Sequence, residues 1–168
     1  MPPRAAAIAK QARTHRSSRS TSLFDEIIAA ELDAGDRVIA DTPHFLVFTP
    51  AAAKWPLEIM VMAKRAVPSF PHLTSEERDD LAAILDSLFR AIDMFFEGVE
   101  RTPYIAAWNQ APAQSPDDGR LHLQLFSLMR SPGRMKYLAG SESGMGVWVS
   151  DTTPESVASK MRQLYVLD

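Results

Sequence analysis

The residues best suited to contact a ligand lie in one stretch of the chain, residues 120–146. In its first part, leucines alternate with His122, Gln124 and Phe126. A period of two predicts a strand that buries Leu121, Leu123 and Leu125 and turns His122 and Gln124 to the opposite face. That opposite face is a candidate floor for a binding site.

A glycine-rich segment follows the strand after a Ser-Pro-Gly turn. In GSESGMG, residues 140–146, three glycines surround one carboxylate and two hydroxyls, which allows backbone to approach a polar ligand closely. Lys136, Tyr137 and Glu142 add a cation, an aromatic ring and a carboxylate, a combination that would suit a sugar phosphate. The spacing matches neither the GxGxxG fingerprint nor a Walker loop. Spacing therefore leaves open a strand followed by a glycine-rich surface loop.

Histidine is the other residue type that could act in catalysis or metal binding. The chain has only His15, His44, His72 and His122. A lone histidine with neutral amides nearby is a poor divalent-metal site, because no carboxylate completes the ligand shell. Nothing around His122 completes a catalytic group, so we predict a hydrogen-bonded sheet residue there. The sequence predicts no catalytic residue and no metal ligand set.

Helical periodicity and capping signals predict three helices around these residues. Ser22 with Asp25 begins a helix that ends near Gly35, with an apolar face of Leu23, Phe24, Ile27, Ile28 and Leu32. A capping box at residues 74–77 begins a long helix with an apolar face of Leu81, Ile84, Leu85, Leu88, Ile92 and Phe95, stopped by Gly98. Thr153 caps a terminal helix whose buried stripe is Val157, Met161, Leu164 and Tyr165.

Short strands are predicted between the helices, at residues 37–41, 45–49, 58–63 and 104–110. Strands separated and followed by helices favour an α+β domain built on an antiparallel sheet. Glu58 has apolar neighbours on both sides, which favours a structural carboxylate that anchors its strand to a loop.

Composition narrows the class of protein. The 168 residues are 46% hydrophobic and 23% charged, which is typical of one globular domain, and the net charge of −3 suggests no bulk electrostatic partner. Absence of cysteine fits a reducing cytoplasm, and no apolar run reaches the roughly 18 residues of a membrane span. Residues 1–20 are basic and lack aromatics, which favours a solvated arm or linker helix over binding to nucleic acid or membrane.

Several segments, taken in order, resemble the C-terminal half of the galactose-1-phosphate uridylyltransferases, in the histidine-triad superfamily. They are TPHFLVFTPAAAKWPLEIMVMAKR, LTSEERDDLAAIL, YIAAWNQAP, RSPGRMKYLAGSESGMG and DTTPESVASKMR. The resemblance implies a histidine-triad-like (HIT-like) domain over residues 21–168, an antiparallel sheet with a long helix and a C-terminal helix packed on it.

The resemblance also implies a hexose-binding loop. The family pattern Lys-aromatic-x-small-Gly-x-Glu is matched by Lys136, Tyr137, Ala139, Gly140, Ser141 and Glu142. By resemblance, Glu142 would accept hydrogen bonds from sugar hydroxyls and Lys136 would lie near the phosphates, while the backbone around Tyr137 and Ala139 would shape the pocket. Charge-assisted hydrogen bonds suit such a role, because they are the strong ones.

The chain departs from the family where many members hold zinc or iron. Asn109 follows Trp108, where many members have a histidine, and the family's His-x-His pair reads Arg120-x-His122 or His122-x-Gln124. The family's metal ligands are therefore largely missing, and we expect no cofactor in this chain. His122, Gln124 and Asn109 stay as possible accessory residues.

The family's nucleophilic histidine belongs to a His-Pro-His motif in the N-terminal half, and this chain contains no such motif. The resemblance implies the sugar-nucleotide-binding half of a split transferase, inactive by itself. Its partners would be UDP-hexose, hexose 1-phosphate and an N-terminal half, on a separate chain or on a homodimer mate. The alternative is a non-catalytic HIT-like binding or scaffold domain. A histidine-triad hydrolase acting alone is the least favoured reading.

Overall fold

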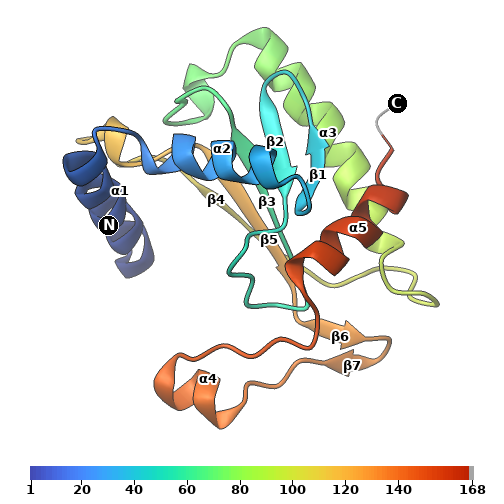
Figure 1. The fold of residues 1–168 in the computed structure, drawn as a ribbon. Coiled ribbons are helices and arrows are strands. Elements are labelled where there is room, and N and C mark those ends of the chain that lie inside the picture. Colours follow the sequence, from blue (N-terminus) through green and yellow to red (C-terminus); the bar gives the residue numbers. More distant parts are fainter. Residues whose placement is uncertain (167–168) are drawn as a thin grey trace.

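An antiparallel sheet organises the computed structural model, which describes residues 1–166 (Figure 1). Within these residues five strands pair in the order β1-β2-β3-β5-β4. They are β1 (Val38–Asp41), β2 (Phe45–Phe48), β3 (Leu57–Ala63), β4 (Ile105–Asn109) and β5 (His122–Ser127). The predicted α+β class and the strand positions are confirmed. Residues 167 and 168, the end of the predicted domain, lie outside the described residues.

One face of the sheet, the packed face, is covered by α3 (Ser75–Asp93) and α5 (Pro154–Leu164). The alternating leucines of β5 are buried in this core, as predicted. The capping box of α3 is present, because Thr74 Oγ1 accepts from Glu77 N and a Glu77 carboxylate oxygen accepts from Thr74 N. The helix ends at Asp93, before the predicted stop at Gly98.

The opposite face, the clefted face, is covered by α1 (Pro3–Arg19) and α2 (Leu23–Ala34). Phe24 and Ile28 of α2 are buried there against Leu46, Phe48 and Met62. Leu32, on the predicted apolar face of this helix, is 41% exposed. Glu31 is buried in its neighbourhood instead, where the Arg37 guanidinium pairs with its carboxylate at 2.9 Å.

The basic amino end is a helix that docks on its own domain. Arg13 and Arg16 of α1 both bond the Asp118 carboxylate, at 2.7 Å and 2.6 Å. Asp118 ends the short 3₁₀ helix η2 (Pro116–Asp118), and a second such turn, η1 (Phe70–His72), precedes α3. The basic residues of α1 thus anchor a helix that has little apolar surface of its own.

Residues 129–150, which we name the arm, extend away from the sheet (Figure 1). They contain the hairpin of β6 (Met129–Ser131) and β7 (Arg134–Met135), followed by the short helix α4 (Gly140–Met145). The sequence predicted a loop here. No helix within residues 1–166 is long and apolar enough to cross a membrane.

Candidate functional site

Lys136 holds the middle of the arm together. Its Nζ lies 2.7 Å from Glu142 Oε1 and also donates to the carbonyl oxygens of Lys54 (2.8 Å) and Val149 (2.6 Å). An ammonium group has three donors, so all three are used by these contacts. Because Lys54 precedes β3, Lys136 ties the arm to the sheet.

Glu142 completes this arrangement from α4. Its Oε2 accepts from Ala139 N at 2.7 Å and its Oε1 accepts from Val149 N at 3.2 Å. Only 6% of the residue is exposed. The hydrogen bond from Lys136, helped by the two backbone donors, lowers the pKa of Glu142 to about 2, so the carboxylate is charged at neutral pH. Both side chains therefore shape the arm, and their contacts with a sugar phosphate stay a prediction.

The remaining predicted loop residues face solvent. Tyr137 is 89% exposed, and Ala139, Gly140 and Ser141 are exposed as well. The arm also exposes Leu138, Met145, Val147 and Val149. This end of the arm combines accessible backbone with apolar side chains, which is the surface that a ligand or a partner would meet.

An aromatic cluster connects the arm to the loop before β3 and to β5. Trp55 stacks on Phe126 at a centroid distance of 5.0 Å and meets Trp148 edge-on at 5.2 Å. Lys136 Nζ lies 5.7 Å and 5.6 Å from the centroids of the two tryptophan rings. Our sequence reasoning missed this cluster. The only sequence pattern that pointed to the cluster was the alternation of β5, which places Phe126 on the same face as His122 and Gln124.

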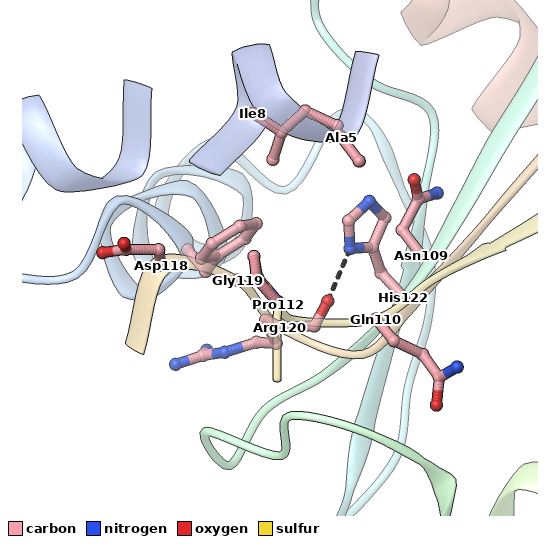
Figure 2. A pocket seen from close by; sticks show the side chains of 10 residues that line it. Ala5, Ile8, Asn109, Gln110, Pro112, Asp118, Gly119, Arg120 and His122 are labelled. Atoms are coloured by element: carbon pink, nitrogen blue, oxygen red, sulfur yellow. Dashed lines mark hydrogen bonds between the residues drawn. The ribbon is translucent and has the colours of Figure 1, made fainter. Parts of the chain in front are cut away.

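His122 and Gln124 lie on the clefted face, as the alternation predicted. His122 pairs across the sheet with Asn109 on β4 and Met62 on β3. The helices above bury both side chains, with His122 only 5% exposed. His122 Nδ1 lies 2.8 Å from the carbonyl oxygen of Arg120, the contact drawn in Figure 2. This confirms a hydrogen-bonded sheet residue.

The protonation state of His122 follows from these surroundings. Burial lowers the pKa of the imidazole, and the positive charge of Arg4 lowers it further, against the opposing effect of the Arg120 carbonyl. The ring is therefore neutral at neutral pH, with its hydrogen on Nδ1 and a lone pair on Nε2.

A close backbone contact sets Asn109 beside His122. A Cβ placed on Gly119 would lie 2.6 Å from Ala111 Cα, so only glycine allows the chain leaving β4 and the chain entering β5 to approach this closely. Figure 2 shows Asn109 and His122 on one side of this contact and Arg120 below it.

Arg120, two residues before His122, has a buried side chain. It donates to the carbonyl oxygen of Lys64 at 3.1 Å and to Asp25 Oδ1 of α2 at 2.5 Å. Residues 1–166 contain no group of three or more His, Cys, Asp or Glu that could hold a metal ion. The side chains present here do not fit a zinc or iron site.

Glu58 anchors β3 to the preceding loop, as predicted. Its Oε2 accepts from Lys54 N at 2.7 Å and Trp55 N at 3.3 Å, while its Oε1 accepts from Gln124 Nε2 at 2.5 Å. Because the Lys54 carbonyl also binds Lys136, one short loop connects the two groups of predicted site residues. The structure thus places the loop residues on the arm and the accessory residues under α1, with this loop between them.

Comparison with known proteins adds the evolutionary relationship. The fold is HIT-like: a zinc-bound histidine triad family protein from Mycobacterium smegmatis superposes on 82% of the chain, with a TM-score of 0.50 at 15% identity, and the superposed region covers 91% of that protein. Residues 8–166 match the family described as galactose-1-phosphate uridyl transferase, C-terminal domain. The chain belongs to this family.

Individual relatives agree with that assignment. A galactose-1-phosphate uridylyltransferase from Neurospora crassa is 32% identical over 92% of this chain. A solved uridylyltransferase structure matches with a TM-score of 0.87 and 30% identity over 98% of the chain. The matched region is 40% of the first protein and 51% of the second, so the chain spans about half the length of these relatives.

Proposed function

We propose that this chain is the hexose- and sugar-nucleotide-binding half of a galactose-1-phosphate uridylyltransferase. The reaction would convert UDP-glucose and galactose 1-phosphate to UDP-galactose and glucose 1-phosphate through a uridylylated histidine of a partner half. The observation that carries the proposal is the match of residues 8–166 to the family, with the Lys136–Glu142 segment formed on an exposed arm. The partner would attack phosphorus, and this chain would hold and orient the sugar.

The arm offers chemistry for holding a sugar. An ionised carboxylate has about four acceptor positions. In Glu142, contacts with Lys136, Val149 N and Ala139 N occupy three acceptor positions. One position on Oε2 remains for a sugar hydroxyl. The exposed backbone around Tyr137 and Ala139 lies next to it in the sequence and supplies further donors and acceptors.

The surface offered to a partner half includes the outer edge of β4. Ile105 is 50% exposed, and Ala106 and Ala107 beside it are exposed too. At the opposite end of the sheet, α5 packs against β1. An unpaired strand edge with apolar side chains can accept a strand from another domain. We place the partner half at this edge, within reach of the arm, in a cytoplasmic assembly in which two copies of the whole enzyme would form a dimer.

The direct test is calorimetric titration of UDP-glucose and galactose 1-phosphate into the purified chain, with and without a co-expressed His-Pro-His half. Binding or turnover restricted to the mixture would support the proposal. Absence of both ligand binding and complex formation would contradict it, and would leave a non-catalytic domain with the same fold.

A variant pair tests the role of Glu142. Glu142→Gln should weaken sugar-nucleotide binding by the mixture roughly tenfold or more, because a charged acceptor is lost. Lys136→Met breaks the same ion pair and keeps the carboxylate, and both variants are compared with free galactose as the probe, because this ligand has no phosphate for Lys136 to contact. Equal losses in the two variants would assign the effect to the shape of the arm and remove Glu142 from direct contact with the sugar.

A further inference from the structure

A cavity of about 370 Å³ lies on the clefted face, away from the exposed end of the arm. Helices α1 and α2 form its roof, and β3, β5 and the loop before β3 form its floor. Most of its walls are apolar, and they are Ile8, Leu23, Phe24, Ile27, Met60 and Met62. A concave apolar space with a few convergent polar groups is the usual form of a small-molecule site.

His122 presents the first of these polar groups. Its Nδ1 is bonded to the Arg120 carbonyl, and Nε2 has no hydrogen-bond partner among residues 1–166. His122 lines both this cavity and the smaller neighbouring pocket drawn in Figure 2, where its second ring nitrogen points toward Ala5 of α1. The ring also packs against Phe24 at a centroid distance of 5.9 Å. A neutral imidazole in this state offers one hydrogen-bond acceptor beside an aromatic wall.

Arg4 presents the second polar group from the roof. One of its guanidinium nitrogens donates to Gln124 Oε1, and no other contact of Arg4 is formed within residues 1–166. Gln124 is two residues from His122 on the same face of β5, so the residue that Arg4 contacts is about 6–7 Å from His122 along the strand. The other donors of Arg4 remain free for a ligand.

The charge balance of the cavity favours a singly charged anion. Glu58 also lines it, and three donors, from Lys54, Trp55 and Gln124, occupy its carboxylate oxygens. Arg4 and Lys54, which also lines the cavity, exceed Glu58 by one positive charge, so the cavity can hold a carboxylate ligand. A phosphate dianion would exceed this balance by one negative charge and would meet more repulsion from Glu58.

We propose that this cavity binds a planar aromatic or heteroaromatic carboxylate of about the size of an indole acid. The ring would lie between Phe24 and the methionines of β3. A ring N–H or O–H would donate to His122 Nε2, and the carboxylate would pair with Arg4. This site uses neither the arm nor the β4 edge, and it shares with the proposed transferase only the accessory residues His122 and Gln124.

Calorimetric titration with indole-3-acetate as the probe tests the site on the full chain. We expect saturable 1:1 binding. Two related probes separate the contacts: 1-methylindole-3-acetate lacks the N–H donor, and tryptamine replaces the anion by a cation. Each should bind at least tenfold more weakly. No binding of indole-3-acetate up to its solubility limit, or equal binding of tryptamine, would overturn the proposal.

Variants assign the contacts to residues. Arg4 is exposed on α1, so Arg4→Met should fold normally and bind indole-3-acetate at least tenfold more weakly. His122→Phe should have a similar effect, and His122→Gln should recover part of the affinity, because a glutamine oxygen can replace Nε2 as an acceptor. Ala7→Trp, which fills the cavity from the exposed helix, should abolish binding. Unchanged affinity in Arg4→Met and Ala7→Trp would place the probe elsewhere.

Discussion

The two faces of the sheet are built differently although they share the same strands. The packed face meets α3 and α5 through a continuous apolar core that includes Ile84 and Leu88, both fully buried. The clefted face meets α1 and α2 through a smaller cluster, a cavity and several buried polar groups, among them His122 and Gln124. We infer that most of the apolar stabilisation comes from the packed face, and that the clefted face can therefore accommodate polar groups for ligand binding.

The helices that cover the two faces are also held by different forces. Helix α3 combines an apolar stripe with a capping box and is specified by its own sequence. Helix α1 buries only Ala9 and Ala12, and its firm contacts are ionic, from Arg13 and Arg16 to Asp118. We expect a helix held in this way to be displaced more easily than α3.

The largest difference between the faces should come from isoleucine truncation. Ile84→Ala on the packed face removes a fully buried side chain and should lower the free energy of unfolding by about 3–4 kcal/mol. Ile27→Ala is the matched variant on the clefted face, where the side chain is partly buried beside the cavity, and should cost about 1 kcal/mol. Urea denaturation followed by circular dichroism measures both. Equal losses would contradict the division between the faces.

A smaller effect is expected from the capping carboxylate of α3. The Arg65 guanidinium lowers the pKa of Glu77 to about 2, from an ordinary value of 4.5. A carboxylate with a lowered folded-state pKa stabilises the protein above pH 4.5, and this contribution is lost as pH falls from 4.5 through about 2. Glu77→Gln should cost roughly 1 kcal/mol at pH 7, since the partner Arg65 is half exposed.

The acid dependence provides the check on Glu77. Unfolding free energies measured from pH 7 to pH 2 should fall less steeply for Glu77→Gln than for the parent chain below pH 4.5. Parallel curves would show that Glu77 contributes no acid-sensitive stability.

The smallest global effect should come from Asp118→Asn on the clefted face. Burial by itself would raise the pKa of Asp118, but hydrogen bonds from Arg13, Ser115 and Arg16 outweigh it and lower the pKa. Because the side chain of Arg13 is 62% exposed and that of Arg16 is 41% exposed, we expect a loss of less than about 1 kcal/mol in global stability. Hydrogen exchange should nevertheless speed up throughout α1 and remain unchanged in α3.

Raised salt is the matched treatment for the parent chain, because it screens exposed ion pairs. One molar sodium chloride should release α1 in the same way as Asp118→Asn. Protection of α1 that survives both treatments would show that apolar contacts hold this helix.

The sequence predicted the elements whose signals are local. The alternation of β5, the capping box of α3, the N-cap of α5 and the glycine that ends α2 could each be recognised from neighbouring residues. Leu32 shows the limit of such reasoning. It continues the apolar stripe of α2, yet 41% of it is exposed, and only the tertiary arrangement decides this exposure.

The candidate site also has some features that the sequence predicted and others that only the structure revealed. The segment from Lys136 to Glu142 could be found from residue types, because its cation, aromatic ring and carboxylate are adjacent in the chain. The internal use of Lys136 could not, because two of its partners, the carbonyls of Lys54 and Val149, are distant in sequence. The cavity beside His122 was equally hidden, since five separate segments line it.

The exposed edge of β4 also bears on how the isolated chain behaves in solution. Between Ile105 and Asn109 there is no lysine and no proline, the residues with which proteins commonly protect strand edges from unwanted pairing. Copies of this chain should therefore add strand to strand as concentration rises, first to dimers and then to aggregates. Ala106→Lys, on the exposed edge, should raise solubility and weaken docking of a partner half together.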